Sequence, residues 1–109
     1  KEEKNVIVDF FKEDKLLVFT LTEDVDQHTS EKIRRKMDNE IKRYIPRKVI
    51  FDFSNVTFMD SAGIGMIIGR YKMAKMLGGS LEMVNVSPSI RKIFEMSGVV
   101  KICPIREAS

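Results

Sequence analysis

Residues 48–66 read KVIFDFSNVTFMDSAGIGM, and this stretch decides the fold. It opens at residues 48–53 with β-branched and aromatic residues so dense that they predict a strand buried on both faces, as in a parallel sheet. A loop at residues 54–60 follows, and then small and apolar residues predict a helix from Ser61 to Leu77. A strand, a loop and a helix in this order predict an α/β fold.

The residues before this stretch predict an opening hairpin and a first helix. Val6–Phe11 and Leu16–Leu21 are rich in β-branched and aromatic residues, and the polar residues 12–15 between them favour a turn. Asp26 precedes a helix that ends near Tyr44, shortly before a proline. Its apolar residues recur at steps of four, four and three and so form one stripe, made of Ile33, Met37, Ile41 and Tyr44.

The residues after residue 77 predict the rest of a single α/β domain. Two glycines at 78–79 stop the second helix, and residues 80–85 favour a fourth strand. Pro88 suits the first turn of a third helix that ends near Met96, and residues 99–102 predict a short fifth strand. The expected order is ββαβαβαβ, in one domain over residues 1–109 with a mixed, mostly parallel sheet.

Composition limits the classes of function. Of the 109 residues, 43% are hydrophobic and 32% charged, which is typical of a folded domain with one core. The net charge of +3 is small and its signs are interleaved, so it argues only weakly for nucleic acid. The longest apolar stretch, residues 62–68, is broken by glycines and too short to span a membrane. We expect no membrane contact.

Cysteine and histidine each occur once, which bears on redox state and metal binding. Cys103 is the single cysteine and cannot form an internal disulfide, which indicates a reducing cytoplasm. We expect it to be a small buried residue of the last strand. One cysteine and one histidine do not make a metal site without a cluster of carboxylates, which the sequence lacks. We expect no metal and no cofactor. His28 is interpreted as a loop or capping contact.

Asp60 and Ser61 stand at the start of the second predicted helix. The ordinary interpretation is a plain N-cap, because Asp and Ser are favoured there. If Asp60 is the cap, however, the Ser61 hydroxyl lies free in the first turn. The helix dipole would tolerate a phosphate at that place, and the added charge would strongly affect the binding of a docked partner. The pair therefore favours a phosphorylation-controlled switch.

The residues around Ser61 do not form an enzyme's motif. Gly63, Gly65 and Gly69 loosely match a dinucleotide-binding pattern, but that pattern should follow its strand directly, without the intervening loop. Met59 stands where a hydrolase elbow would place its first glycine. No pairing of a nucleophile with a base is visible, so we expect no catalysis. The glycines are interpreted as sites where another backbone or a partner comes close.

The second predicted helix has two apolar sides. One should pack on the sheet and consists of Ile64, Ile67, Ile68, Tyr71 and Ala74. The other carries Met66, Met73, Met76 and Leu77, with Gly69 and Arg70 among them. Either neighbouring helices cover these methionines, or they form an adaptable surface for a protein partner.

A run of basic residues marks one side of the first predicted helix. Three acidic residues dilute this run, so a solvated face is favoured over a surface for nucleic acid or membrane. The basic residues are Lys32, Arg35, Lys36, Lys42 and Arg43, and the acidic ones are Glu31, Asp38 and Glu40.

Several segments together resemble the STAS-domain anti-sigma factor antagonists of bacteria, most closely the anti-sigma-F antagonists of sporulation. The likeness holds in register over nearly the whole chain, so it is far more specific than any single motif. The segments are Asp26-Gln27-His28-Thr29, Thr57-Phe58-Met59-Asp60-Ser61-Ala62-Gly63, Gly69-Arg70-Tyr71-Lys72, Val86-Ser87-Pro88 and Phe94-Glu95-Met96-Ser97-Gly98.

The resemblance implies a mechanism. The unmodified antagonist binds an anti-sigma factor that is also a serine kinase, which frees the sigma factor. The kinase then phosphorylates Ser61, the complex dissociates, and a serine phosphatase resets the antagonist. Asp26 is implied to lie in the loop that faces the kinase. The protein is expected to be a cytoplasmic monomer that does not bind nucleic acid directly, with a partner surface of Asp26, Asp60, Ser61, Gly63, Gly65, Met66, Gly69, Arg70 and Met73.

A second function remains open within the same family. STAS domains also serve as ligand- or nucleotide-sensing modules in transporters and stress complexes, and a polar pocket near Asp60 would favour that role. A basic adaptor for nucleic acid is a third alternative, which would show steeply salt-dependent binding.

Overall fold

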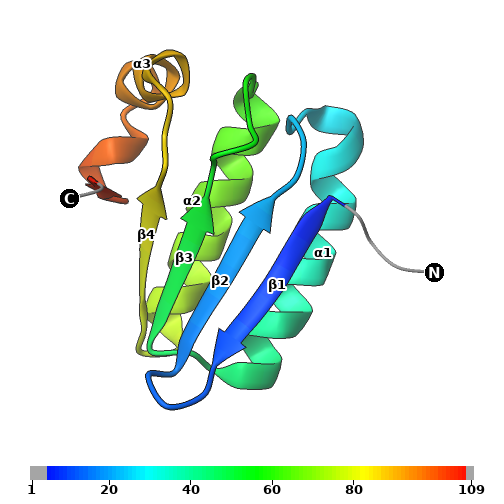
Figure 1. Ribbon diagram of the computed structural model, residues 1–109, viewed down its shortest axis with the longest axis vertical. Coiled ribbons are helices and arrows are strands. Elements are labelled where there is room, and N and C mark those ends of the chain that lie inside the picture. The colour runs from blue at the N-terminus through cyan, green and yellow to red at the C-terminus, as the bar shows by residue number, and fades with distance from the viewer. Residues whose placement is uncertain (1–4, 108–109) are drawn as a thin grey trace.

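The structure, a computed structural model, describes residues 5–107. It consists of one five-stranded sheet, in the order β1-β2-β3-β4-β5, with three α-helices (Figure 1). The expected order of strands and helices is confirmed. The elements are β1 (Val6–Phe11), β2 (Leu16–Leu21), α1 (Gln27–Tyr44), β3 (Lys48–Asp52), α2 (Ser61–Met76), β4 (Ser80–Val84), α3 (Pro88–Ser97), the 3-10 helix η1 (Val99–Lys101) and β5 (Ile105–Arg106).

The sheet is mixed and mostly parallel, as predicted. β1 and β2 form an antiparallel hairpin in which Val6 pairs with Leu21 and Phe11 with Leu16. β2, β3, β4 and β5 are parallel neighbours. Parallel pairing requires a crossover between consecutive strands, and α1 and α2 provide two of them. Figure 1 shows that all three helices begin at the edge of the sheet where β2, β3 and β4 end.

The core lies between the sheet and the two long helices, which run behind it in Figure 1. The predicted stripe of α1 is confirmed, since Ile33, Met37 and Ile41 are buried. Tyr44, at the end of the stripe, stacks on Phe10 with ring centroids 4.1 Å apart. Burying each such side chain stabilises the fold by about 1.5–3 kcal/mol relative to leaving it exposed.

Aromatic contacts attach α3 to the central strand. Phe53, directly after β3, meets Phe94 of α3 edge to face at 5.3 Å between centroids. Both rings are fully buried. In β3 itself the consecutive residues Val49, Ile50 and Phe51 are all buried, which confirms the prediction from their apolar density. The aromatic contact fixes α3 beside the carboxyl end of β3, where α2 also begins.

The predicted fifth strand at residues 99–102 is wrong. Gly98 takes a φ of 83°, and the chain then turns tightly as η1, in which the Lys101 N–H donates to the Gly98 carbonyl at 3.0 Å. Val99 is buried in the core, so packing and the glycine override its strand preference. The fifth strand is Ile105–Arg106. Cys103 is buried, as predicted, but it precedes that strand.

The glycine pair after α2 allows a close approach. Gly78 has a φ of 88°, which suits the end of a helix. A Cβ on Gly79 would lie 2.7 Å from the Pro46 carbonyl oxygen, so only glycine fits there without movement. α2 ends at Met76, one residue earlier than predicted. No helix in the described part of the chain is both long and apolar enough to cross a membrane.

Candidate functional site

Ser61 is the first residue of α2, and Asp60 is the residue that caps the helix. The Asp60 carboxylate accepts the backbone N–H groups of Ala62 at 2.9 Å and Gly63 at 3.4 Å. The predicted division of roles is confirmed, because capping leaves the next residue's hydroxyl unused. Ser61 is exposed, and within residues 5–107 its hydroxyl has no hydrogen-bond partner. The hydroxyl is therefore open to solvent at this edge of the sheet.

Asp24 fastens the loop before Ser61. Its carboxylate accepts the backbone N–H groups of Thr57 at 2.7 Å and Phe58 at 3.0 Å, and the Thr57 hydroxyl at 3.0 Å. The hydrogen bond from the Thr57 N–H is the main cause that holds the pKa of Asp24 below its usual value. No local pattern in the sequence marks Asp24, because its partners lie more than thirty residues away.

A parallel β-bridge joins the same two loops a second time. It pairs Val25, in the loop between β2 and α1, with Met59, in the loop between β3 and α2. Asp26 follows Val25 and caps α1, since its carboxylate accepts the Thr29 N–H at 3.0 Å. That hydrogen bond is the first cause that lowers the pKa of Asp26. Asp26 is exposed and, through Val25, adjoins the loop before Ser61. Figure 1 shows that α1 and α2 begin at the same edge of the sheet.

A polar hollow of about 530 Å³ lies between the starts of α1 and α2. Ser61 stands on its rim. From α1 it is lined by Gln27, Ser30, Glu31 and Arg34, and from the start of α2 by Asp60, Ser61, Ala62 and Gly65.

A second hollow, of about 380 Å³ and mainly apolar, lies on the other side of Ser61. It is bordered by α2 and α3, and Met96 on α3 is 82% exposed. Phe58, in the loop before α2, is 53% exposed. Sequence analysis assigned no partner contact to α3, although Met96 in the apolar pattern of that helix was the available signal. Ser61 therefore lies on a ridge between a polar and an apolar hollow.

The expected methionine surface on α2 is wrong beside Ser61. Met66 is fully buried and Met73 is half-buried against the core, so neighbouring elements cover both. Met76 is 82% exposed, but it lies at the far end of α2. The opposite side is as predicted, since Ile67 and Ala74 are buried and Ile64, Ile68 and Tyr71 pack partly on the core.

Arg70 is also inside rather than on a partner surface. Its Nε lies 2.8 Å from the Asp38 carboxylate of α1, as an ion pair without the alignment of a good hydrogen bond. Gly63 is buried too, because Met59 occupies the direction in which a Cβ would point. Direct contact with a partner is therefore not open to Met66, Arg70 or Gly63. Of the expected surface, Asp26, Ser61 and Gly65 are exposed, and Asp60 and Gly69 are partly exposed.

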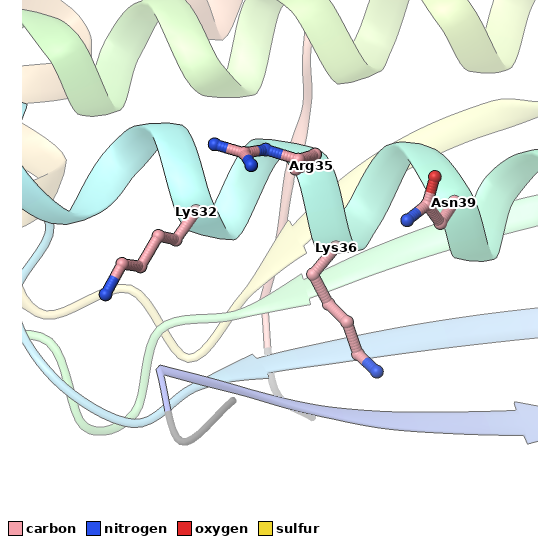
Figure 2. Close-up of a pocket in the computed structure, with 4 residues that line it drawn as sticks. All are labelled: Lys32, Arg35, Lys36 and Asn39. Carbon is pink, nitrogen blue, oxygen red and sulfur yellow. The ribbon is translucent and has the colours of Figure 1, made fainter. Parts of the chain in front are cut away.

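The basic face of α1 forms no convergent site. Lys32, Arg35, Lys36 and Asn39 line a hollow of about 160 Å³. Figure 2 shows that these side chains extend in different directions from successive turns of α1. Arg35 pairs with Glu31 at 3.7 Å and Lys36 with Glu40 at 3.4 Å. The arrangement agrees with a solvated face. No group of three or more metal-ligating side chains occurs in residues 5–107.

Comparison with known proteins places this geometry in a family. The profile of the STAS domain family matches residues 7–109. The anti-sigma F factor antagonist of Paenibacillus polymyxa is 38% identical over 90 residues, which cover 83% of this chain and 77% of that protein. This chain belongs to the STAS family of anti-sigma factor antagonists. The anti-sigma-B factor antagonist of Bacillus subtilis is 26% identical to this STAS protein over 105 residues. These residues cover 96% of this chain and 94% of that relative.

Solved structures agree with the assignment. The unphosphorylated form of the anti-sigma factor antagonist SpoIIAA superposes on this STAS protein with a TM-score of 0.82 at 28% identity, over 95% of this chain and 88% of that one. The phosphorylated form of the Bacillus cell fate determinant SpoIIAA gives a TM-score of 0.73 at 28% identity, over 95% and 91% of the two chains.

Proposed function

We propose that this protein is an anti-sigma factor antagonist that is switched off by phosphorylation of Ser61. Its unmodified form binds an anti-sigma factor with serine kinase activity and so frees a sigma factor, and a serine phosphatase resets it. The observation that carries the proposal is the exposed Ser61 hydroxyl, left free because Asp60 caps α2. The relatives are anti-sigma factor antagonists, which supports an anti-sigma factor as the partner. SpoIIAA has been solved in an unphosphorylated and a phosphorylated form, which supports phosphorylation as the modification.

Electrostatics support a switch that needs no change of fold. Phosphorylation adds a charge of about −1.5 to −2. It would stand beside the carboxylates of Asp60 and Glu31, on the ridge that a partner must touch. A partner surface fitted to a neutral hydroxyl would meet a bulky dianion there. A loss of about 3 kcal/mol in binding free energy raises the dissociation constant more than a hundredfold.

The proposed docking face differs from the methionine side expected from the sequence. It combines the exposed Asp26, Ser61 and Phe58 with the apolar hollow beside α3, which the exposed Met96 borders. Exposed apolar side chains around a concave surface are typical of protein-binding sites. Met66 is buried and so does not belong to this face.

Kinase assays with a candidate anti-sigma factor test the proposal. Mass spectrometry after incubation with ATP should place one phosphate on Ser61. Ser61→Ala should bind the kinase and not be released by ATP, whereas Ser61→Asp should bind at least a hundredfold more weakly. Ser89→Ala is the matched control, because Ser89 is also an exposed serine in the first turn of a helix. Equal affinities of Ser61→Ala and Ser61→Asp, or a phosphate on another residue, would refute the proposal.

A ligand-sensing role is the second candidate, which the polar hollow beside Asp60 and Ser61 favours. A ligand present at a hundred times its Kd would stabilise the protein by about 2.7 kcal/mol. Thermal unfolding with adenine and guanine nucleotides therefore tests this role. An unchanged unfolding midpoint at millimolar nucleotide excludes tight binding of nucleotides.

A further inference from the structure

Arg34 is a cation of α1 that faces the same polar hollow as Ser61. Its side chain is exposed, and no carboxylate of residues 5–107 forms an ion pair with it. Its neighbours differ in this respect, because Arg35 pairs with Glu31 and Arg70 pairs with Asp38. The guanidinium of Arg34 is therefore available to an anion that enters the hollow.

A second cation, Arg70 of α2, lies near Arg34. Burial is the main cause that lowers the pKa of Arg70, the charge of Asp38 opposes it, and the charge of Arg34 lowers it further. Arg34 and Arg70 thus lie close enough to repel each other, and the carboxylate of Asp38 forms its ion pair with Arg70. An additional negative group beside Arg34 would offset this repulsion.

Two backbone donors at the start of α2 are already in use. Asp60 already accepts the N–H groups of Ala62 and Gly63, which are donors that an anion at a helix start would use. The remaining cation on the rim is Arg34, whose planar guanidinium can bind two phosphate oxygens at once. Glu31 and Asp60 also line the hollow and oppose a phosphate there, but Glu31 is occupied by Arg35.

We propose that Arg34 receives the phosphate of phosphorylated Ser61 within the same molecule, so that the modification bridges α1 and α2. This inference rests on the proposed phosphorylation of Ser61. The bridge would fill the polar hollow and draw the new charge toward Gln27 and the Asp26 loop, where a partner is proposed to dock. Release of the partner then follows from an occupied surface as well as from repulsion, and Arg34 is a positioning residue of the switch.

The second pKa of the phosphoserine measures this contact. A nearby cation stabilises the dianion and lowers that pKa from its usual value of about 6. Phosphoserine is installed at position 61 by genetic encoding, which needs no kinase, and is titrated by phosphorus-31 NMR. Arg34→Gln should raise the second pKa by about 0.5 to 1, and Arg34→Lys by less, since it keeps the charge but not the planar fork.

Lys32→Gln is the matched control, because it removes the same charge from α1 at the hollow of Figure 2, which Ser61 does not line. It should leave the second pKa unchanged. Equal pKa values in the wild type and Arg34→Gln, or equal rises in Arg34→Gln and Lys32→Gln, would overturn the inference. This titration uses no kinase, so it tests only the contact between Arg34 and the phosphate. The kinase assay tests the proposed function separately, and failure to modify Ser61 there would refute that function.

Discussion

Replacing Gly63 by alanine tests how tightly α2 is packed on the loop that carries Ser61. A Cβ at this position would lie 2.3 Å from Cγ and 2.8 Å from Sδ of Met59. Met59 is only 2% exposed and its backbone is held by the bridge to Val25, so its side chain has to change rotamer, toward the apolar hollow that it borders, to relieve the overlap. Overpacking of this kind in a core costs about 1–3 kcal/mol.

Gly69→Ala in the same helix is the matched control. Nothing lies within 4 Å of a Cβ added there, so this variant gains only the helix preference of alanine, about 0.5–1 kcal/mol. Gly63→Ala gains at most the same preference and also suffers the overlap. The difference between the two variants in free energy of unfolding is therefore the overlap itself, about 1–3 kcal/mol in favour of Gly69→Ala.

Urea unfolding followed by far-UV circular dichroism measures this difference, and the chain has no tryptophan for fluorescence. With an m-value of about 1–2 kcal/mol/M, the two midpoints should be separated by about 0.5 to 3 M. The wild type should lie between them or close to Gly63→Ala. Coincident midpoints, or a higher midpoint for Gly63→Ala, would show that Met59 does not clamp the start of α2.

Further predictions concern a buried ion pair, a thiol and a loop carboxylate. Arg70→Met leaves the Asp38 carboxylate without its cation and should lower the free energy of unfolding by about 1–3 kcal/mol, measured with urea. Burial raises the pKa of the Cys103 thiol to about 12, so at pH 8 a thiol reagent should react with it only at the rate of unfolding. Asp24→Asn should destabilise the native protein by about 1 kcal/mol at pH 7, because an exposed charged acceptor is screened by solvent. The pKa of Asp24 is lowered in the folded protein, so its contribution is full above the ordinary aspartate pKa of about 4. The contribution is lost as the pH falls through the folded value, and the urea midpoints of the wild type and Asp24→Asn should converge there.

Local patterns in the sequence predict the parts of the fold that depend on local physics. The stripe of α1 and the apolar run of β3 were correct because helical and strand periodicity is a property of neighbouring residues. The fifth strand failed at Val99, where the positive φ of Gly98 and burial of the side chain override strand preference.

The prediction that the methionine side of α2 docks a partner failed for a different reason. A helix that is apolar on every side is covered on more than one side, but periodicity does not identify the elements that cover it. The answer is α1, whose Asp38 reaches Arg70 across 32 positions of sequence. Asp24 was missed likewise, because its hydrogen bonds to Thr57 and Phe58 connect loops that only the folded sheet brings together.

The double attachment of the loop before Ser61 limits the shape of any enzyme that modifies it. To thread residues 55–67 as an extended strand, an enzyme would have to break the hydrogen bonds of Asp24, separate Val25 from Met59 and unwind the first two turns of α2. The catalytic cleft must instead be wide enough to admit the tip of a folded helix. A free peptide cut from this stretch lacks the rounded contour that such a cleft selects, and should be a poor substitute for the intact domain.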